Sequence, residues 1–120
     1  MKLIKSFAFA LNGLKACFFS ETNFKIHLLL ALFAVSFGIG FKLSGTQWLA
    51  IIFCIAFVTA LEMINTAIEK LCDVVHKDLH PTIKKVKDIS AGAVLIAAVC
   101  SLIVGAVIFV PKIIIYIQLF

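Results

Sequence analysis

Three long stretches of this chain carry almost no charge, and this feature limits the possible folds more than any other. Residues 43–61 and 89–111 contain no charged side chain, and residues 26–41 contain only His27. Each stretch is close to the roughly 20 apolar residues that an α-helix needs to cross about 30 Å of hydrocarbon. Of the 120 residues, 63% are hydrophobic and 14% are charged, whereas soluble domains are about half apolar and a quarter charged. The sequence therefore predicts an all-α membrane protein with three transmembrane helices.

The first segment of the chain has a different pattern. Between residues 3 and 19 the apolar side chains recur at three- and four-residue steps, and Lys5, Asn12 and Lys15 lie between them. A helix of this kind can place its apolar face at the headgroup boundary while its lysines contact anionic lipid. We expect an amphipathic interfacial helix here, followed by the membrane spans within one membrane-embedded domain, residues 1–120.

Turn residues and charges set the expected limits of the spans. The three predicted spans cover about residues 24–42, 47–71 and 89–110. The polar segment 73–88 is predicted to be a loop, with Pro81 as a helix stop. The tail after Pro111 is too short to cross again, so we expect it to rest at the far interface.

The distribution of lysines predicts the orientation. Of the 11 lysines, four precede the core of the first span and five lie from Lys70 to Lys87, whereas one lies between the first two spans and one follows the third. Cytoplasmic segments of membrane proteins are enriched in lysine and arginine. We therefore expect a membrane protein with its N-terminus in the cytoplasm and its C-terminus outside. The net charge of +5 then reflects orientation, and no nucleic acid partner is expected.

The second predicted span continues into a stripe of polar side chains. On a helix, spacings of 3, 4, 7 and 11 from the first residue place five of them on one face: Glu62, Asn65, Thr66, Glu69 and Asp73. A carboxylate at the edge of the hydrocarbon costs several kcal/mol unless it is paired or hydrated. Glu62 is therefore a functional candidate, although an interfacial acid that only reaches for water is the alternative.

Further charged residues are expected at the same membrane depth. Glu21 lies at the cytoplasmic start of the first span, where it could also serve the helix dipole. Clustered carboxylates suit a hard divalent cation, and Mg²⁺ is favoured where phosphate and water complete its ligands. Lys84, Lys85 and Lys87 supply positive charge, or act only as cytoplasmic anchors. Together these groups are typical of phosphoryl transfer, which depends on positioning and charge neutralisation.

Several motifs also resemble those of a known family. The string Glu62-Met-Ile-Asn65-Thr-Ala-Ile-Glu69, followed by Asp73, His80-Pro81 and Lys87-Asp88-Ile-Ser-Ala-Gly-Ala-Val94, resembles the prokaryotic integral-membrane diacylglycerol kinase and undecaprenol kinase family. The resemblance covers nearly the whole chain. It implies a homotrimer in the bacterial cytoplasmic membrane that transfers the γ-phosphate of ATP to a membrane lipid alcohol with the help of Mg²⁺.

The resemblance also implies roles for individual residues. Glu62 matches the catalytic base, Glu21 and Glu69 match the metal-holding acids, and Asn65 matches an active-site support. The residues that match the nucleotide-binding set are Glu21, Glu69, Asp73, His80, Lys87 and Asp88. The chain contains no arginine, so its lysines cannot give the bidentate phosphate contacts of an arginine.

The choice of substrate rests on small differences. His80-Pro81 and Ala91-Gly92-Ala93-Val94 are more similar to the branch that phosphorylates undecaprenol than to the diacylglycerol branch, whose product is phosphatidic acid. An alternative of another class is a non-enzymatic channel or assembly subunit. A pore would carry polar groups through the whole depth of a span, whereas here every acid is expected at the cytoplasmic side, which favours the enzyme.

Overall fold

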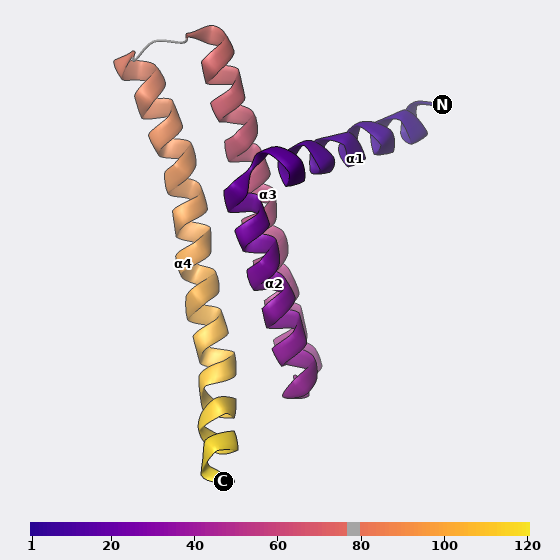
Figure 1. Ribbon diagram of the computed structural model, residues 1–120, viewed down its shortest axis with the longest axis vertical. Helices are drawn as coiled ribbons and strands as arrows, with labels where there is room; N and C mark the ends of the chain where they lie inside the picture. Colours follow the sequence, from indigo (N-terminus) through magenta and orange to yellow (C-terminus); the bar gives the residue numbers. More distant parts are fainter. Residues whose placement is uncertain (77–79) are drawn as a thin grey trace.

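The computed structural model describes residues 1–76 and 80–120, and these residues form helices without strands. The helices are α1 (Lys2–Ser20), α2 (Thr22–Gly40), α3 (Gly45–Val75) and α4 (Pro81–Gln118) (Figure 1). Residues 77–79 of the predicted loop lie outside the described residues. The all-α prediction is confirmed.

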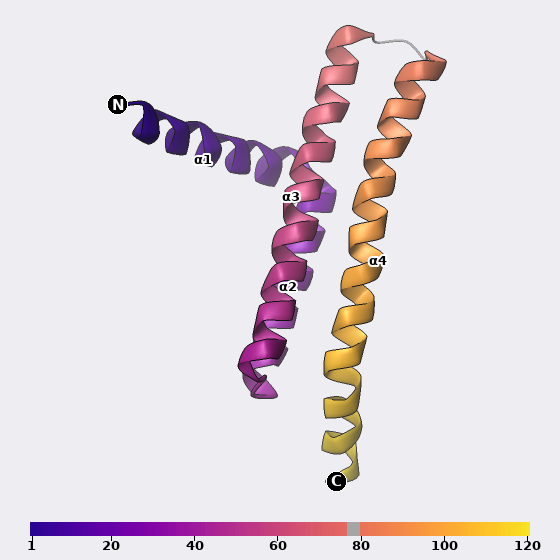
Figure 2. The ribbon, with the colours of Figure 1, turned by 180° about the vertical axis from the view of Figure 1, so that it is seen from behind.

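Helices α2, α3 and α4 form an elongated bundle, and α1 leaves this bundle sideways. The three bundle helices run side by side, whereas α1 projects away from the point where α2 begins, partway along α3 (Figures 1 and 2). Helix α3 packs against both α2 and α4. In α1, Cys17 is the one buried residue. The bundle therefore depends on α3, and α1 contributes little to its interior.

The turn between α2 and α3 is defined by local hydrogen bonds. Lys42 has a left-handed backbone with φ 54°, and the backbone N–H of Leu43 donates to the Gly38 carbonyl at 3.2 Å. Ser44 then caps α3: its Oγ accepts from the Gln47 N–H at 3.2 Å, and Gln47 Oε1 accepts from the Ser44 N–H at 3.0 Å. This reciprocal capping box satisfies two backbone donors at the helix start.

Helix α4 is longer than the sequence predicted at both ends. Pro81 was expected to stop a helix, but it occupies the first turn of α4, where its missing N–H has no helical partner to lose. At the other end α4 continues through Pro111 to Gln118, although proline removes one backbone hydrogen bond. The predicted loop 73–88 is correspondingly wrong, because α3 extends to Val75 and α4 begins at Pro81.

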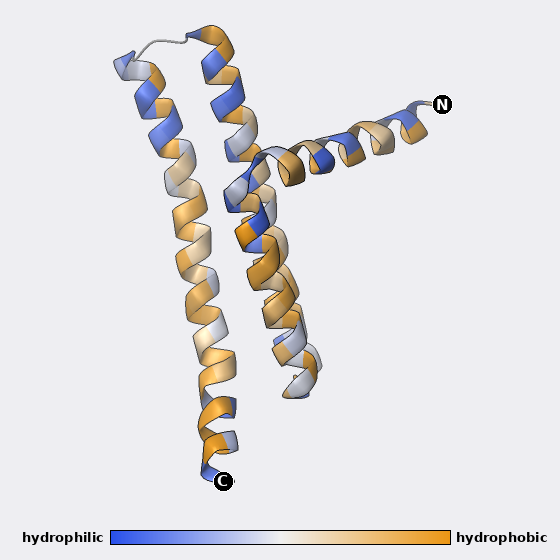
Figure 3. Ribbon diagram, viewed as in Figure 1, coloured by the Kyte–Doolittle hydropathy of each residue, from blue (hydrophilic) through white to orange (hydrophobic). Residues whose placement is uncertain are grey.

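The helices are apolar along most of their length. Among the described residues, four helices are long and apolar enough to cross a membrane, judged by length and composition. Hydrophilic residues concentrate where α3 ends and α4 begins and along one side of α1, while the rest of α4 is mostly hydrophobic (Figure 3). These features support a membrane protein.

The end of the bundle opposite this hydrophilic region has its own apolar core. Leu43, Ile51 and Ile108 are buried together there, with Trp48 packed against them. Gly38 of α2 faces this core, and a Cβ placed on it would lie 2.7 Å from Trp48 Cη2 and 3.0 Å from Leu43 Cδ1. The glycine therefore allows α2 to approach the indole ring closely.

We expect Gly38→Ala to destabilise the protein, because the added methyl group overlaps a rigid indole ring. Overpacking of this kind costs about 1–3 kcal/mol. Thermal unfolding in detergent, followed by circular dichroism, should give a lower Tm than for the wild type. Gly40→Ala is the matched control, because a Cβ there has no neighbour within 4 Å. Equal Tm values for the two variants would contradict the close approach of Gly38 to Trp48.

Candidate active site

Glu62 lies near the middle of α3 and is buried, with 8% of its side chain exposed. Its Oε1 is 2.9 Å from Nε2 of His27, which comes from α2. This distance is typical of a charge-assisted hydrogen bond. A buried carboxylate is strongly disfavoured unless it is paired, so His27 explains how α3 can hold Glu62 in a buried position.

One helical turn further along α3, Asn65 and Glu69 interact. Asn65 Nδ2 donates to Glu69 Oε1 at 3.3 Å, and both residues are half-buried. Asn65 Oδ1 is buried and has no hydrogen-bond partner. Buried acceptors are rarely left without a partner. The two residues therefore present oxygen atoms that an additional donor or a cation could satisfy.

Glu21 lies at the junction between α1 and α2, where it is the N-cap residue of α2 without a capping side-chain hydrogen bond. Its Oε1 is 4.0 Å from Nζ of Lys70 on α3. Lys70 directly follows Glu69 in the chain, so this contact brings the Glu21 carboxylate to the same level of α3 as Glu69. The predicted proximity of Glu21 to the polar stripe is consistent with this contact.

Two ion pairs lie at the hydrophilic end of α3 and α4. Lys87 Nζ is 2.6 Å from Asp73 Oδ1 and links the two helices, whereas Lys84 Nζ is 2.6 Å from Asp88 Oδ2 within α4. The hydrogen bond to Asp73 raises the pKa of the Lys87 ammonium above its ordinary value. Lys87 and Asp88 are adjacent in sequence, but they have different partners.

His80, which is predicted to bind the nucleotide, has a structural role at the start of α4. It is the N-cap residue of α4, and its Nδ1 accepts a hydrogen bond from the Thr82 N–H at 3.2 Å. Its ring lies 5.3 Å from that of His76, measured between centroids. The His80 imidazole therefore caps the start of α4 at Pro81.

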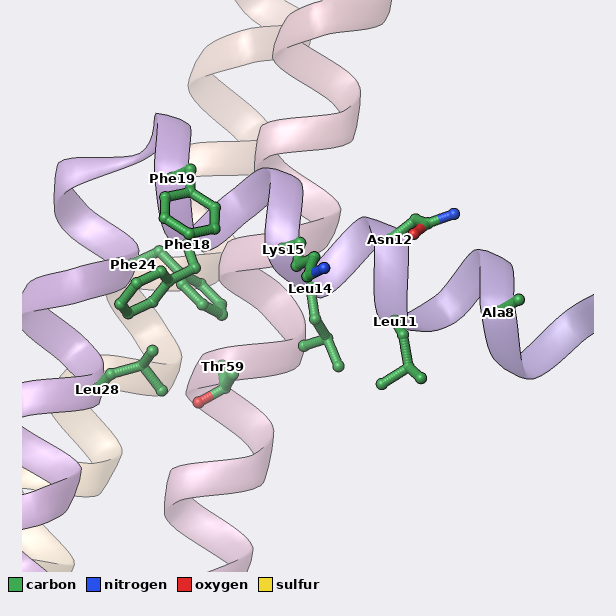
Figure 4. A pocket seen from close by; sticks show the side chains of 10 residues that line it. All are labelled: Ala8, Leu11, Asn12, Leu14, Lys15, Phe18, Phe19, Phe24, Leu28 and Thr59. Atoms are coloured by element: carbon green, nitrogen blue, oxygen red, sulfur yellow. The ribbon is translucent and has the colours of Figure 1, made fainter.

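An apolar pocket of about 600 Å³ lies where α1 meets α2 and α3. Figure 4 shows Leu11 and Leu14 extending from one side of α1, with Asn12 on the other side. Phe24 and Leu28 of α2 and Thr59 of α3 also line this pocket. Thr59 is three residues, about one helical turn, before Glu62. The pocket can accept apolar chains close to the buried carboxylate.

The described residues offer few candidate ligands for Mg²⁺. They contain no group of three or more histidine, cysteine or acidic side chains arranged to hold a metal ion. Mg²⁺ in phosphoryl-transfer sites commonly uses one or two carboxylates, with water and phosphate as its other ligands. Glu69, with the unpartnered Oδ1 of Asn65 beside it, and Glu21 fit that smaller requirement.

Comparison with known proteins identifies the family. A sequence profile described as prokaryotic diacylglycerol kinase matches residues 8–109. The chain belongs to the prokaryotic diacylglycerol kinase family. It is similar to the undecaprenol kinase of Bacillus subtilis, with 38% identity over 92% of this chain and 90% of that protein. It is also similar to the diacylglycerol kinases of Synechocystis (32% identity, 91% of this chain and 63% of that protein) and of Escherichia coli K12 (26%, 85% and 84%).

Membership of this family confirms the predicted enzyme class, a lipid phosphotransferase. The structure brings some of the predicted site residues into contact: Asn65 contacts Glu69, and Asp73 contacts Lys87. The sequence reasoning missed two partners, His27 and Lys70. The only signal for His27 was that it is the single titratable residue in the uncharged stretch 26–41.

We expect Asp73→Asn to lower the pKa of Lys87, because the amide cannot replace the carboxylate as a charged acceptor. The pair stabilises the folded kinase while Lys87 is charged, and that contribution is lost as the pH rises through the raised pKa of Lys87. NMR titration of ¹³Cε-labelled lysines measures this pKa. Asp88→Asn is the matched control, because Asp88 pairs with Lys84. An unchanged pKa in the Asp73 variant would show that another group raises it.

Proposed function

We propose that this lipid kinase transfers the γ-phosphate of ATP to the hydroxyl group of undecaprenol, with Glu62 as the catalytic base. The observation that carries the proposal is the buried Glu62 carboxylate, held by His27 at 2.9 Å and one helical turn from Thr59 in the wall of an apolar pocket. A lipid hydroxyl is the one part of a long-chain alcohol that requires a polar partner at this depth.

The position of Glu62 suits the role of a base, because its carboxylate is buried one helical turn from Thr59 in the wall of the apolar pocket. In the proposed reaction Glu62 takes the hydroxyl proton of the lipid as the lipid oxygen forms its bond to phosphorus. Asn65 supports the site by holding the neighbouring Glu69 through its Nδ2.

The exposed end of the polar stripe is proposed to bind the nucleotide. Glu21 and Glu69 would hold Mg²⁺, which when bound supplies neutralisation of the phosphate charge. Lys87 would bind phosphate oxygens, and its contact with Asp73 restrains the ammonium group at the boundary of α3 and α4. The remaining proposed nucleotide-binding residues are His80 at the start of α4 and Asp88, which pairs with Lys84.

The proposed arrangement in the membrane assigns about residues 24–42, 47–71 and 89–110, largely within α2, α3 and α4, as the spans and α1 as the interfacial helix. The sideways direction of α1 and its apolar side (Figures 1 and 4) support this division. The lysine distribution supports a cytoplasmic N-terminus and an external C-terminus. A homotrimer is consistent with the exposure of Asp73 and Lys87 in a single chain, because neighbouring copies would enclose the nucleotide.

We prefer undecaprenol to diacylglycerol as the proposed substrate, because the chain is more similar to an undecaprenol kinase than to the diacylglycerol kinases compared below. Identity is 38% to an undecaprenol kinase and 26–32% to diacylglycerol kinases. The apolar pocket beside α1 offers few polar groups for the ester groups of a diglyceride: Asn12, Lys15 and Thr59. Formation of phosphatidic acid from diacylglycerol is the second candidate function.

We expect the purified protein in bicelles to transfer radiolabelled phosphate from ATP to undecaprenol with Mg²⁺, and to act less on diacylglycerol. Thin-layer chromatography of the lipid products from parallel reactions measures both activities. Glu62→Gln is the matched negative control, because it keeps the size of the side chain and removes the carboxylate that is proposed to accept the proton. Predominant phosphorylation of diacylglycerol would overturn the choice of lipid, and no transfer to either lipid by folded protein would overturn the proposed function.

We expect Glu69→Gln to increase the Mg²⁺ concentration that gives half-maximal activity. Loss of one charged ligand removes an interaction of about 1.5–3 kcal/mol, or roughly tenfold to a hundredfold in affinity. A titration of activity with Mg²⁺ at saturating ATP measures this change, and activity should recover at high Mg²⁺. An unchanged half-maximal concentration would remove Glu69 from the metal site.

A further inference from the structure

The contact between His27 and Glu62 joins two helices at the proposed catalytic base. The imidazole comes from α2 and the carboxylate from α3, and the side chains are 24% and 8% exposed. With its proton on Nε2, His27 donates to Oε1 of Glu62. A carboxylate rotates easily about its last side-chain bond, so a donor at one oxygen determines the direction of the other.

His27 also lies in the wall of a second apolar cavity. This cavity of about 610 Å³ is bounded by α2, α3 and α4. Thr59 lines both this cavity and the pocket beside α1. The His27–Glu62 pair is therefore next to both apolar spaces. His27 lines the second cavity, and Glu62 lies within one helical turn of Thr59, which lines both. An imidazole in this position could act on the carboxylate or simply shape the lipid cavity.

We infer that His27 is a positioning residue for the phosphoryl transfer: it engages Oε1 of Glu62 and thereby directs Oε2 toward the lipid hydroxyl. This inference rests on the proposed function. In the step that it supports, the lipid O–H bond breaks and its proton goes to Oε2. The lipid oxygen forms a bond to the γ-phosphorus, and the bond from that phosphorus to the bridging oxygen breaks, its electron pair leaving with ADP.

The hydrogen bond between His27 and Glu62 favours an orienting role for His27 over a purely space-filling one. An apolar side chain would complete the cavity wall equally well, but it would leave the buried Glu62 carboxylate without its charge-assisted hydrogen bond. The 2.9 Å contact spans two separate helices, so it also fixes the base relative to α2, which lines both apolar spaces. Misplacement of a reacting group by about 1 Å can cost roughly a hundredfold in rate.

Three substitutions at His27 separate these roles. Glutamine carries its amide nitrogen as many bonds from Cβ as Nε2 of histidine, so His27→Gln keeps a donor within reach of Glu62. The amide nitrogen of His27→Asn is one bond shorter, and His27→Leu retains bulk without a donor. Ser36→Ala on the same helix is the folding control, because its exposed Oγ donates only to Leu32 O of α2.

The experiment measures kcat and KM for undecaprenol in bicelles, with the folded fraction of each variant checked by circular dichroism and gel filtration. We expect His27→Leu and His27→Asn to lower kcat by roughly 10- to 100-fold with little change in the lipid KM. His27→Gln should retain kcat within a few-fold of the wild type.

Other outcomes overturn the inference. A normal kcat in His27→Leu would show that Glu62 needs no orienting partner, and a raised KM with unchanged kcat would make His27 part of the lipid cavity alone. Equal loss in the leucine and glutamine variants, both folded, would also contradict a role for the donor. Failure of the proposed function is a separate result, because the wild-type protein itself would then phosphorylate neither lipid.

Discussion

The need to pair a buried carboxylate constrains how the helices of this kinase pack. Glu62 directly follows the uncharged stretch 43–61 on α3, and only 8% of its side chain is exposed. Removal of such a group from water costs several kcal/mol unless a partner compensates for it. His27 supplies that partner from α2, so α2 and α3 must contact each other at this depth. The junction of α1 with α2 is then close to the same level, which brings α1 and its apolar pocket beside the site.

Exposure increases along α3 from the site outward. Glu62 is buried, Asn65 and Glu69 are half-buried, and Asp73 is exposed, with 65% of its side chain accessible. One helix face therefore passes from a buried to an exposed environment within about three turns. A reaction between a lipid alcohol and a water-soluble nucleotide requires such a transition, because the two substrates approach from opposite phases. The ion pair of Asp73 and Lys87 links α3 and α4 at this exposed end.

Much of the fold could be predicted because membrane spans and polar stripes follow simple periodicities. The uncharged stretches located the three long helices of the bundle, and the spacing of Glu62, Asn65 and Glu69 placed them on one face. The helix ends were predicted less well, because charged residues mark where a helix leaves the hydrocarbon and do not mark where it ends. Helix α4 thus begins at Pro81, before the lysines that were assigned to a loop.

The contacts of the site were harder to predict than its residues. His27 belongs to an apolar stretch of α2, and no local motif connects it with a glutamate 35 positions later in the chain. Only the packing of α2 on α3 brings the two side chains together. The same limit applies to Lys70, whose approach to Glu21 depends on where the junction of α1 and α2 meets α3.

The two apolar spaces beside Glu62 suggest how chemistry and lipid selection are divided within the site. A long-chain alcohol needs only its hydroxyl at the level of the carboxylate, while its tail can remain in the membrane or in an apolar pocket. The proposed base is therefore expected to be indifferent to the type of tail, and selection would fall on the side chains that line the pocket between α1, α2 and α3. Because α1 contributes Leu11, Leu14 and Phe18 to that lining, α1 is the element in which substitutions are expected to change the lipid substrate while the polar stripe on α3 is kept.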